Sequence, residues 1–364
     1  MKKYLFIILA LIVLFSTVAC KNEPTPPTFT VTYDYNYEGA ESKQLTGQTT
    51  VTKPEIPTRE DYVFLYWDLN GSLFDAWGSS LTNDIYLKAI WAKHVSAISD
   101  MKNSEGKYIL SENFIVSHAT MDLKAGTTLD IDLNGKILAW AHPYNAISVE
   151  GELTINDTSE LGTGRLCNTL TTSTNTKAYT ILYVSNTGKL TINGGTFGDL
   201  DTNKTNDNKA NLGPAIYNNG GTVVINKGNF TNHDGYWKNA DNTTAWSYAI
   251  RNNNGQIIIN DCNLYGRLTG GITSEGEKAL VTINGGKFLA TNKDLISLLA
   301  TGENGKFNIT NGSFTYNNEN GQLMGAFKSD PKWDGQSDFE KNGFTITGGT
   351  FIQNGVEKNY RTNN

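Results

Sequence analysis

The chain has 364 residues, of which 38% are hydrophobic and only 18% are charged, so it is long enough for two domains. Its formal net charge of −6 argues against a nucleic-acid partner, because nucleic-acid-binding proteins present a clustered basic face. Its 36 glycines, together with the many Asn and Thr residues of the C-terminal two thirds, favour short strands and tight turns over helices.

Residues 1–19 have the pattern of a bacterial export signal. Two lysines precede an unbroken apolar run over 4–15, and small residues then lead to Cys20. A short apolar segment after a basic start is typical of a secretory signal rather than of a membrane span. The junction resembles a lipobox, although Thr17 replaces the usual leucine, and the resemblance implies cleavage before Cys20 and attachment of lipid to it. The alternative is an ordinary cleaved signal followed by a chance cysteine.

Residues 20–27 follow as a predicted tether. Three prolines in this stretch make it extended and semi-rigid. Two or more acyl chains on Cys20 would anchor the protein stably, whereas one chain would be marginal. We therefore expect a lipid-anchored protein of the cell envelope, on the outer membrane and facing outside, with the membrane as one of its partners.

Residues 28–93 are expected to form a small β domain. Runs rich in aromatic and aliphatic residues predict strands over 29–33, 62–67 and 85–91. A small interior needs large side chains to fill it, so Trp67 and Trp91 are interpreted as core residues rather than as ligand contacts.

This segment resembles the Listeria–Bacteroides repeat, also called the internalin B-type repeat. The resemblance is carried by VTKPEIPTR at 51–59, by the aromatic central strand and by LTNDIYLKAIWA at 81–92. Two residues, Asp61 and Tyr66, stand where that family usually has glycine, so we expect the turn before the central strand to differ. The resemblance implies a β-grasp-like domain that serves as a spacer or interaction module and has no catalytic residues.

An eight-residue motif recurs through residues 94–360. It reads LTINGGTF at 190–197 and VTINGGKF at 281–288, and each copy has a central isoleucine. The isoleucines are Ile155, Ile192, Ile225, Ile259, Ile283, Ile309 and Ile346. The position near the end of the motif holds Phe197, Phe230, Leu264, Phe288, Phe314 and Phe351. The shortest separation, 24 residues from Ile259 to Ile283, sets the length of a bare coil, and longer separations indicate insertions.

A second short strand precedes most copies, for example at 146–149 and 215–218, behind a corner rich in Gly or Asn. Two or three short strands in each turn of about 24 residues are the signature of a parallel β-helix. We therefore predict an all-β protein, in which a right-handed parallel β-helix over 94–360 has the isoleucine and phenylalanine series as internal ladders. This architecture resembles the pectate-lyase-like superfamily, whose fold serves lyases, hydrolases, adhesins and inert rods alike.

The start of this domain is less regular. Segments 106–116 and 127–138 are expected to form the first coils, and the alternative is a separate capping pair of strands. Residues 95–102 are expected to form a short amphipathic helix. Cys167 and Cys262 are interpreted as small buried thiols, because a disulfide would require their Cα atoms to lie within about 7 Å of each other.

An asparagine follows the isoleucine in five copies of the motif. These residues are Asn156, Asn193, Asn226, Asn260 and Asn284. We predict a structural role, in which stacked amides hydrogen-bond along the coils and asparagine is chosen because it tolerates a left-handed turn. The alternative is a polar strip that faces a glycan.

Three insertions, at 161–179, 198–214 and 231–247, follow the motif in successive coils and are expected to emerge at one corner. The third brings several aromatic residues among amides and carboxylates. The candidate ligand-binding residues are Tyr236, Trp237, Trp246 and Tyr248. Exposed rings stack on the C–H faces of sugars and polar neighbours take the hydroxyl groups, so this cluster suits a glycan. The alternative is that the rings pack the loop onto the coils.

A metal site is the second candidate, and no cofactor other than calcium is suggested. Asp199, Asp201 and Asn203 alternate as the oxygen ligands of a calcium loop do, but Lys204 and Ala210 occupy positions where an EF-type loop needs Gly and Glu. The alternative is an ordinary polar loop.

No residue is assigned a catalytic role. Asp130 and Asp132 could project from one strand face as a glycosidase pair does, but solvated acids are the simpler interpretation. Arg251 could serve a lyase as a base, and nothing in the sequence distinguishes that role from surface charge.

These features favour a non-catalytic surface lipoprotein, an adhesin or glycan-binding protein whose partner is an extracellular glycan or a host or cell-surface protein. The alternative function is a polysaccharide lyase or glycoside hydrolase that acts in a groove of the β-helix. Three or more carboxylates, or an arginine among carboxylates, converging in such a groove would favour the enzyme.

Overall fold

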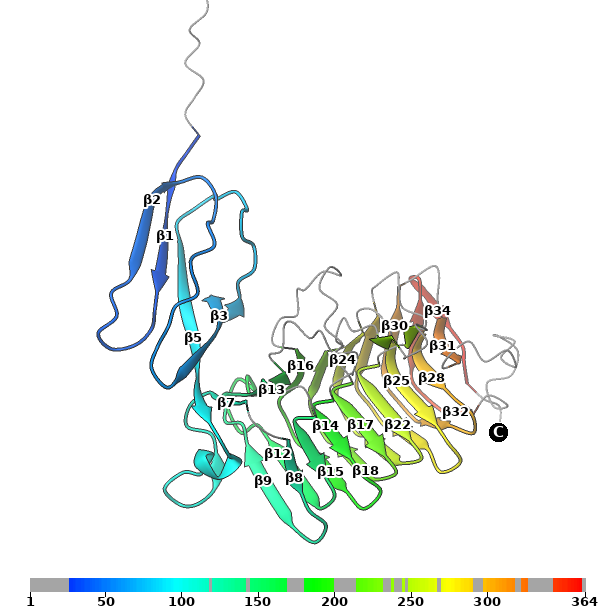
Figure 1. The fold of residues 1–364 in the computed structure, drawn as a ribbon. Coiled ribbons are helices and arrows are strands. Elements are labelled where there is room, and N and C mark those ends of the chain that lie inside the picture. Colours follow the sequence, from blue (N-terminus) through cyan, green and yellow to red (C-terminus); the bar gives the residue numbers. More distant parts are fainter. Residues whose placement is uncertain are drawn as a thin grey trace, which may run out of the picture. The chain divides into compact units, whose positions relative to one another are not determined.

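The computed structural model describes residues 26–117, 120–141, 145–168, 180–199, 214–231, 237–238, 244–245, 248–266, 270–290, 297–317, 322–326 and 343–361. Within these residues the secondary structure is β except for one short 3-10 helix, η1 (Ile98–Met101) (Figure 1). The chain divides into two compact units, residues up to 57 with 66–90, and residues 58–65 with those from 91 onward. The all-β prediction is therefore confirmed.

The first unit is built on a small mixed sheet. Its elements are β1 (Phe29–Asp34), β2 (Lys43–Gln48), part of β3 (Tyr62–Leu69), β4 (Ser72–Leu73) and the first part of β5 (Ile85–Val95). β1 pairs antiparallel with β2 and parallel with β5, while β3 pairs antiparallel with β4. All three strands that the sequence predicts are present.

Aromatic packing fills the first unit. The Tyr33 and Trp67 rings meet edge to face with centroids 5.3 Å apart, and the Tyr33 hydroxyl donates to the Thr52 carbonyl. Trp67 is buried here, which confirms it as a core residue of this unit, whereas Trp91 is buried in the second unit and not in the small domain to which it was assigned. Asp61, which stands where a glycine is usual, has a φ of 60° and thus keeps the left-handed conformation that glycine favours and aspartate tolerates.

The second unit consists of coils that each contribute one strand to three parallel sheets, as in a β-helix (Figure 1). We name each sheet by a residue type that lines it. The isoleucine sheet contains β6 (Tyr108–Ile109), β9 (Thr128–Asp132), β12 (Glu152–Asn156), β15 (Lys189–Ile192), β18 (Thr222–Ile225), β23 (Gln256–Ile259), β26 (Leu280–Ile283), β29 (Lys306–Ile309) and β32 (Phe344–Ile346).

The other two sheets complete each coil. The phenylalanine sheet contains β7 (Phe114–Val116), β10 (Ile137–Trp140), β13 (Arg165–Asn168), β16 (Thr196–Asp199), β19 (Asn229–Thr231), β24 (Asn263–Gly266), β27 (Lys287–Ala290), β30 (Ser313–Tyr316) and β33 (Thr350–Gln353). The tyrosine sheet contains β8 (Met121–Leu123), β11 (Ile147–Val149), β14 (Leu182–Val184), β17 (Ile216–Asn219), β22 (Ile250–Asn253), β25 (Gly270–Glu275), β28 (Ser297–Thr301) and β31 (Gln322–Ala326).

The predicted internal ladders are confirmed. Each of the seven isoleucines pairs in register with the next, from Ile155 and Ile192 to Ile309 and Ile346. The phenylalanine series is likewise in register, and the Phe288 and Phe314 rings stack with centroids 4.7 Å apart and planes 8° apart. Burial of each such side chain contributes roughly 1.5–3 kcal/mol, and a single coil could not supply it without its neighbours.

Buried amides hold the corner between the tyrosine and isoleucine sheets. Asn218 and Asn252 are buried, the Asn218 Nδ2 donates to Asn252 Oδ1 at 2.9 Å, and the Gly221 N–H donates to Asn218 Oδ1 at 3.0 Å. A Cβ at Gly255 would lie 2.1 Å from the Asn218 Nδ2 atom, so this corner requires glycine.

The N-terminal end of the coils corrects one prediction and confirms another. The expected helix over 95–102 is reduced to the four residues of η1, because Val95 is still in β5 and pairs with Val116 of β7. The first residue of the expected helix, Val95, therefore belongs to a strand. The first coils are as predicted, since β6 pairs in parallel with β9 and β7 with β10, and the alternative of a separate cap is wrong.

The C-terminal end of the phenylalanine sheet is formed by a strand of opposite direction. β34 (Val356–Lys358) turns back and pairs antiparallel with β33. The Tyr360 ring then packs edge-on against Phe351 with centroids 5.4 Å apart, and its hydroxyl donates to Gln353 Oε1 at 2.8 Å. The last rung of the phenylalanine ladder is therefore covered from within the chain.

Both described cysteines are buried, as predicted. Cys167 pairs in register with Ala139 and Gly198 in the phenylalanine sheet. Burial raises the pKa of the Cys262 thiol, so the neutral thiol is favoured there.

Candidate functional site

The predicted aromatic platform is only partly visible. Tyr236 and Trp246 lie outside the described residues, as does Cys20. Trp237 is in β20 (Trp237–Lys238), which pairs antiparallel with β21 (Thr244–Ala245). Tyr248, in contrast, is only 2% exposed, so its assignment to an exposed sugar-binding surface is wrong. For this residue the packing alternative holds.

The shared corner of the three insertions is supported by the strands that flank them. β13, β16 and β19 are neighbours in the phenylalanine sheet, and the strands that follow each insertion are neighbours in the tyrosine sheet. One boundary needs correction: residues 165–168 form β13, with Leu166 in register with Phe197, so they belong to the coil and not to the first insertion. The chemistry of the loops themselves lies outside the described residues.

The calcium candidate is not tested. Asp199 ends β16, while Asp201 and Asn203 lie outside the described residues. In the part of the chain that the structure describes, no group of three or more His, Cys, Asp or Glu side chains could hold a metal ion. A search of the same residues for a helix of sufficient length and apolarity to cross a membrane finds none.

The two aspartates of the possible glycosidase pair have structural partners. Asp130 Oδ1 accepts a hydrogen bond from Asn156 Nδ2 at 2.6 Å. Asp132 accepts from the backbone N–H groups of Asn134 and Thr158, at 2.9 and 3.0 Å, and from the Thr158 hydroxyl. Both carboxylates therefore tie successive coils together, a structural role that the interpretation as solvated acids did not include.

The five motif asparagines form the predicted amide ladder along the outside of the isoleucine sheet. Each Nδ2 donates to the Oδ1 of the preceding coil at 2.8–3.0 Å, from Asn193 onto Asn156 through to Asn284 onto Asn260. Asp130 accepts at one end, and the Thr310 hydroxyl donates to Asn284 at the other. The reason given for asparagine was wrong, because none of these five residues has a positive φ.

A different surface, which sequence reasoning did not select, lies on the outer face of the tyrosine sheet. Adjacent strands here place six side chains beside one another, and we call them the tyrosine strip. Its members are Tyr183, Tyr217, Arg251, Asn219, Asn253 and Glu275. The rings of Tyr183 and Tyr217 meet edge to face with centroids 5.5 Å apart, and both residues are half-buried. Each residue as a whole therefore remains partly exposed.

The tyrosine strip is held by three diagonal contacts of one kind. In each contact, a side chain on one strand binds a side chain on the next coil, two residues after the position that pairs with it in register. Asn219 Nδ2 donates to the Tyr183 hydroxyl at 2.7 Å, and Asn253 Nδ2 donates to the Tyr217 hydroxyl at 3.4 Å. Asparagine thus fixes each ring, while the O–H of each tyrosine can still donate.

Arg251 and Glu275 make the third diagonal contact. The Arg251 Nε and Nη2 atoms donate to Glu275 Oε1 at 2.9 and 2.5 Å, and the guanidinium lies 5.0 Å from the centre of the Tyr217 ring. These side chains are 26% and 20% exposed. Arg251 is therefore a charged donor engaged by a carboxylate and an aromatic ring, a poor arrangement for the general base that a lyase requires.

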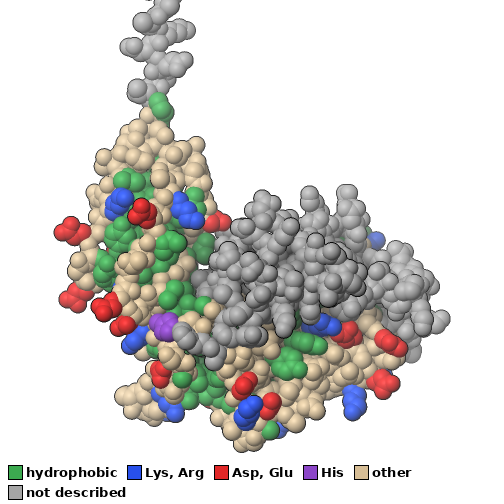
Figure 2. Space-filling view, in the orientation of Figure 1, with side chains coloured by type: hydrophobic (Ala, Val, Ile, Leu, Met, Phe, Trp, Pro, Cys, Tyr) green, Lys and Arg blue, Asp and Glu red, His purple; other side chains and the backbone are tan. Residues whose placement is uncertain are grey.

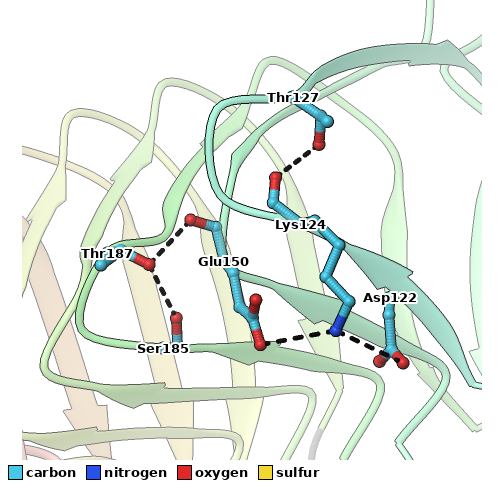
Figure 3. Close-up of polar contacts among 6 residues, drawn as sticks. All are labelled: Asp122, Lys124, Thr127, Glu150, Ser185 and Thr187. Carbon is cyan, nitrogen blue, oxygen red and sulfur yellow. Dashed lines mark hydrogen bonds and ion pairs between the residues drawn. The ribbon is translucent and has the colours of Figure 1, made fainter.

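A charged group continues the strip toward the N-terminal coils (Figure 3). Lys124 Nζ lies 3.9 Å from Asp122 and 3.8 Å from Glu150, and all three side chains are exposed. Figure 3 also shows the Thr187 hydroxyl donating to the Glu150 carbonyl at 2.9 Å. In the register of β8, β11 and β14, Ser148 lies between Asp122 and Tyr183, so this group belongs to the same outer face. On the visible described surface of the coils, charged side chains are scattered among neutral polar ones (Figure 2).

Beyond Arg251 the outer face of the tyrosine sheet becomes buried. Thr273 and Ala300, which follow Arg251 in register, are both fully buried, and Tyr248 is clustered with Ala300. Burial raises the pKa of Tyr248 to about 12, although its contact with Ser297 acts in the opposite direction. The open part of this face thus ends at the Arg251–Glu275 pair.

The strip brings together two rings, two amides and an ion pair, which can stack on a sugar and bond its hydroxyl groups. A sequence signal for it exists: Leu182-Tyr183-Val184, Ile216-Tyr217-Asn218 and Ile250-Arg251-Asn252 share a period-2 pattern that turns the middle residue outward. The hydrogen bonds between coils could not be read from that pattern.

Comparison with known proteins covers one part of the chain. Residues 29–90 match the family model of the Listeria-Bacteroides repeat domain, which confirms the resemblance predicted for 28–93. No curated protein and no solved structure matches the chain. The first unit therefore has a known domain type, and the site on the coils has to be interpreted from its own chemistry.

Proposed function

We propose that this protein is a lipid-anchored surface protein, an adhesin or glycan-binding protein, that binds an extracellular glycan through the tyrosine strip and does not catalyse. One observation carries the proposal: half-buried tyrosines in adjacent coils are fixed by Asn219 and Asn253 on an open sheet face. Rings held in this way lose little conformational entropy when a ligand stacks on them, which favours binding.

The setting of the site supports the same proposal. The signal pattern of residues 1–19, Cys20 and the proline-containing tether would place the protein at the cell envelope, on the outer membrane and facing outside. A repeat domain of the Listeria-Bacteroides type would then separate the coils from the membrane. The partner would be a glycan free in the surroundings or carried by a protein of another cell or of a host.

A glycan array with the full chain in mild detergent tests the proposal. We expect binding to at least one glycan, and we expect the double variant Tyr183→Ala/Tyr217→Ala to lose it. Tyr265→Ala is the matched control, because Tyr265 is 46% exposed on β24 of the phenylalanine sheet. Binding that survives in the double variant would remove the tyrosine strip from the proposal, and no binding at all would overturn it.

The same material distinguishes the alternative function and the metal candidate. Shortened or unsaturated products from a bound polysaccharide would show a hydrolase or a lyase. Binding that a calcium chelator abolishes would support a calcium site near Asp199, whereas binding that is insensitive to the chelator would exclude one from glycan recognition. The anchor is tested separately: fatty-acid labelling of the protein should disappear in Cys20→Ser.

A further inference from the structure

We infer that the tyrosine strip selects uncharged glycans and rejects those rich in uronate or sulfate groups. The inference rests on the proposed function and names the class of ligand for the same site. It follows from how the charges on and beside the strip are already paired, and from which hydrogen-bonding groups remain for a ligand.

Every cation on this face has a carboxylate partner among the described residues. Lys124 Nζ lies between Asp122 and Glu150, at 3.9 and 3.8 Å, and Arg251 is bound by Glu275 through two nitrogen atoms. Among its described residues, three carboxylates against two cations give the face a formal charge of −1. An anionic glycan would have to displace a carboxylate from Lys124 or Arg251, and it would meet the remaining negative charge.

The remaining groups suit sugar hydroxyls. The hydroxyl oxygens of Tyr183 and Tyr217 accept from asparagine, so their protons can be donated to a ligand. Glu275 accepts both bonds from Arg251 at Oε1, which leaves Oε2 to accept from a hydroxyl group. Neutral donors and acceptors beside a ring are what a pyranose needs, whereas a carboxylate or sulfate group needs an unpaired cation.

The length of the face indicates an oligosaccharide rather than a single sugar. The face extends over six adjacent strands, from β8 through β11, β14, β17 and β22 to β25. With neighbouring strands about 4.8 Å apart, five steps span about 24 Å along the direction in which the coils stack. A chain laid in that direction would meet the tyrosines in the middle and an ion pair at each end.

Affinity electrophoresis of the full chain in mild detergent tests this selectivity. The gels would contain either a neutral polymer (β-glucan, mannan or xylan) or an acidic one (polygalacturonate or alginate). We expect retardation by at least one neutral polymer and by neither acidic polymer. Tyr217→Ala should weaken neutral binding roughly tenfold, as expected for loss of one ring stack, and Tyr265→Ala should leave it unchanged.

A charge-conversion variant tests the physical cause. Asp122→Asn/Glu150→Gln removes two exposed carboxylates, frees Lys124 and changes the formal charge of the face from −1 to +1. We expect this variant to gain binding to the acidic polymers at low salt and to lose it when salt is raised, because exposed charges are screened. Its denaturation midpoint should match that of the wild type, since exposed ion pairs contribute little, and this match would show that the gain in binding does not come from unfolding.

The outcomes separate the inference from the proposed function. Binding of an acidic polymer by the wild type, if Tyr217→Ala abolishes it, would keep the glycan site and overturn the selectivity. Failure of the charge-conversion variant to gain any acidic binding would also overturn it. If no polymer binds, or if Tyr217→Ala binds as well as the wild type does, the tyrosine strip is not a glycan site and the proposed function itself fails.

Discussion

The outer faces of the isoleucine and tyrosine sheets belong to the same coils but use their polar residues differently. On the isoleucine sheet, five identical amides stack directly above one another, and each satisfies the next at 2.8–3.0 Å. On the tyrosine sheet the residue type changes from coil to coil, and contacts run diagonally between unlike groups. The amides of the ladder bond to one another, whereas the bonds among the described residues of the tyrosine strip do not use the phenol protons or Glu275 Oε2.

This difference separates scaffold from candidate site. Identical amides in register on stacked strands hydrogen-bond to one another, so the presence of such a column does not require a ligand. A column that changes from tyrosine to arginine to threonine does not obtain the hydrogen bonds that identical stacked residues form with one another. The variation of the tyrosine strip is therefore the better guide to binding, and the following predictions test that division.

The largest expected effect comes from the interior that both faces share. Ile225→Ala removes one rung of the isoleucine ladder and should lower the free energy of unfolding by about 2–5 kcal/mol, because the tight core cannot collapse around the cavity. Chemical denaturation measures this loss. Ile258→Ala is the control, since Ile258 is on the outer face of β23 and 36% exposed. A similar loss in both variants would contradict the assignment of inner and outer columns.

The buried end of the tyrosine sheet predicts an effect of alkaline pH. The pKa of Tyr248 is raised to about 12 from 10.0, so the unfolded chain loses this proton first. Stability is retained below pH 10 and falls as pH rises from 10 to 12, by about 2–3 kcal/mol for this residue. Tyr248→Phe should therefore lose less stability than the wild type over that range in denaturation curves. Equal losses of stability in the two proteins would show that Tyr248, and therefore this end of the face, is accessible to solvent.

The amide ladder predicts a smaller loss. Asn226→Ala breaks the bonds to Asn193 and Asn260 and should cost about 1–2 kcal/mol of stability without changing glycan binding. Thr222→Ala is the control, because Thr222 is exposed on β18, the strand that immediately precedes Asn226, and it should cost about 0.5 kcal/mol or less. If Asn226→Ala weakened binding as Tyr217→Ala does, the ladder would be part of the site and the division between the two faces would be lost.

The smallest effect is expected at the exposed end of the tyrosine face. Lys124→Ala should change stability by about 0.5 kcal/mol or less, because exposed ion pairs at 3.8 and 3.9 Å gain little over water. A double-mutant cycle with Glu150→Gln measures the coupling directly. Coupling of more than about 1 kcal/mol would mean that this group is more rigid than an ordinary surface pair.

The architecture could be predicted because the residues that line the interior recur at regular positions in the sequence. Recurrence of Ile192, Ile225 and their counterparts gave the register of one sheet, and the phenylalanine series gave that of a second. Residues 165–168 were misassigned because Leu166 stands in the phenylalanine column but lies 11 residues after Ile155, whereas Phe197 lies only five after Ile192. The expected helix failed because strand pairing of Val95 outweighs a weak local preference.

The site was predicted less well, for a physical reason. Aromatic residues in an insertion are conspicuous in a sequence, but their exposure depends on tertiary contacts, and Tyr248 is buried against Ala300. Tyr217 and Arg251 stand 34 residues apart and become neighbours only through the coil register. Reading the outward position of each second strand would have identified the column, although not the asparagines that bind it.

The strand that reverses at the C-terminal end also has a consequence for engineering. Because β34 pairs with β33 and Tyr360 packs against Phe351, both in the last rung, these contacts do not depend on how many rungs precede them. The 24-residue unit from Ile259 to Ile283 can be duplicated ahead of the last coil. Each copy would lengthen the stack of coils by about 4.8 Å, and β34 with Tyr360 would still close its end. The closing strand and the repeated coils are thus encoded by separate parts of the sequence.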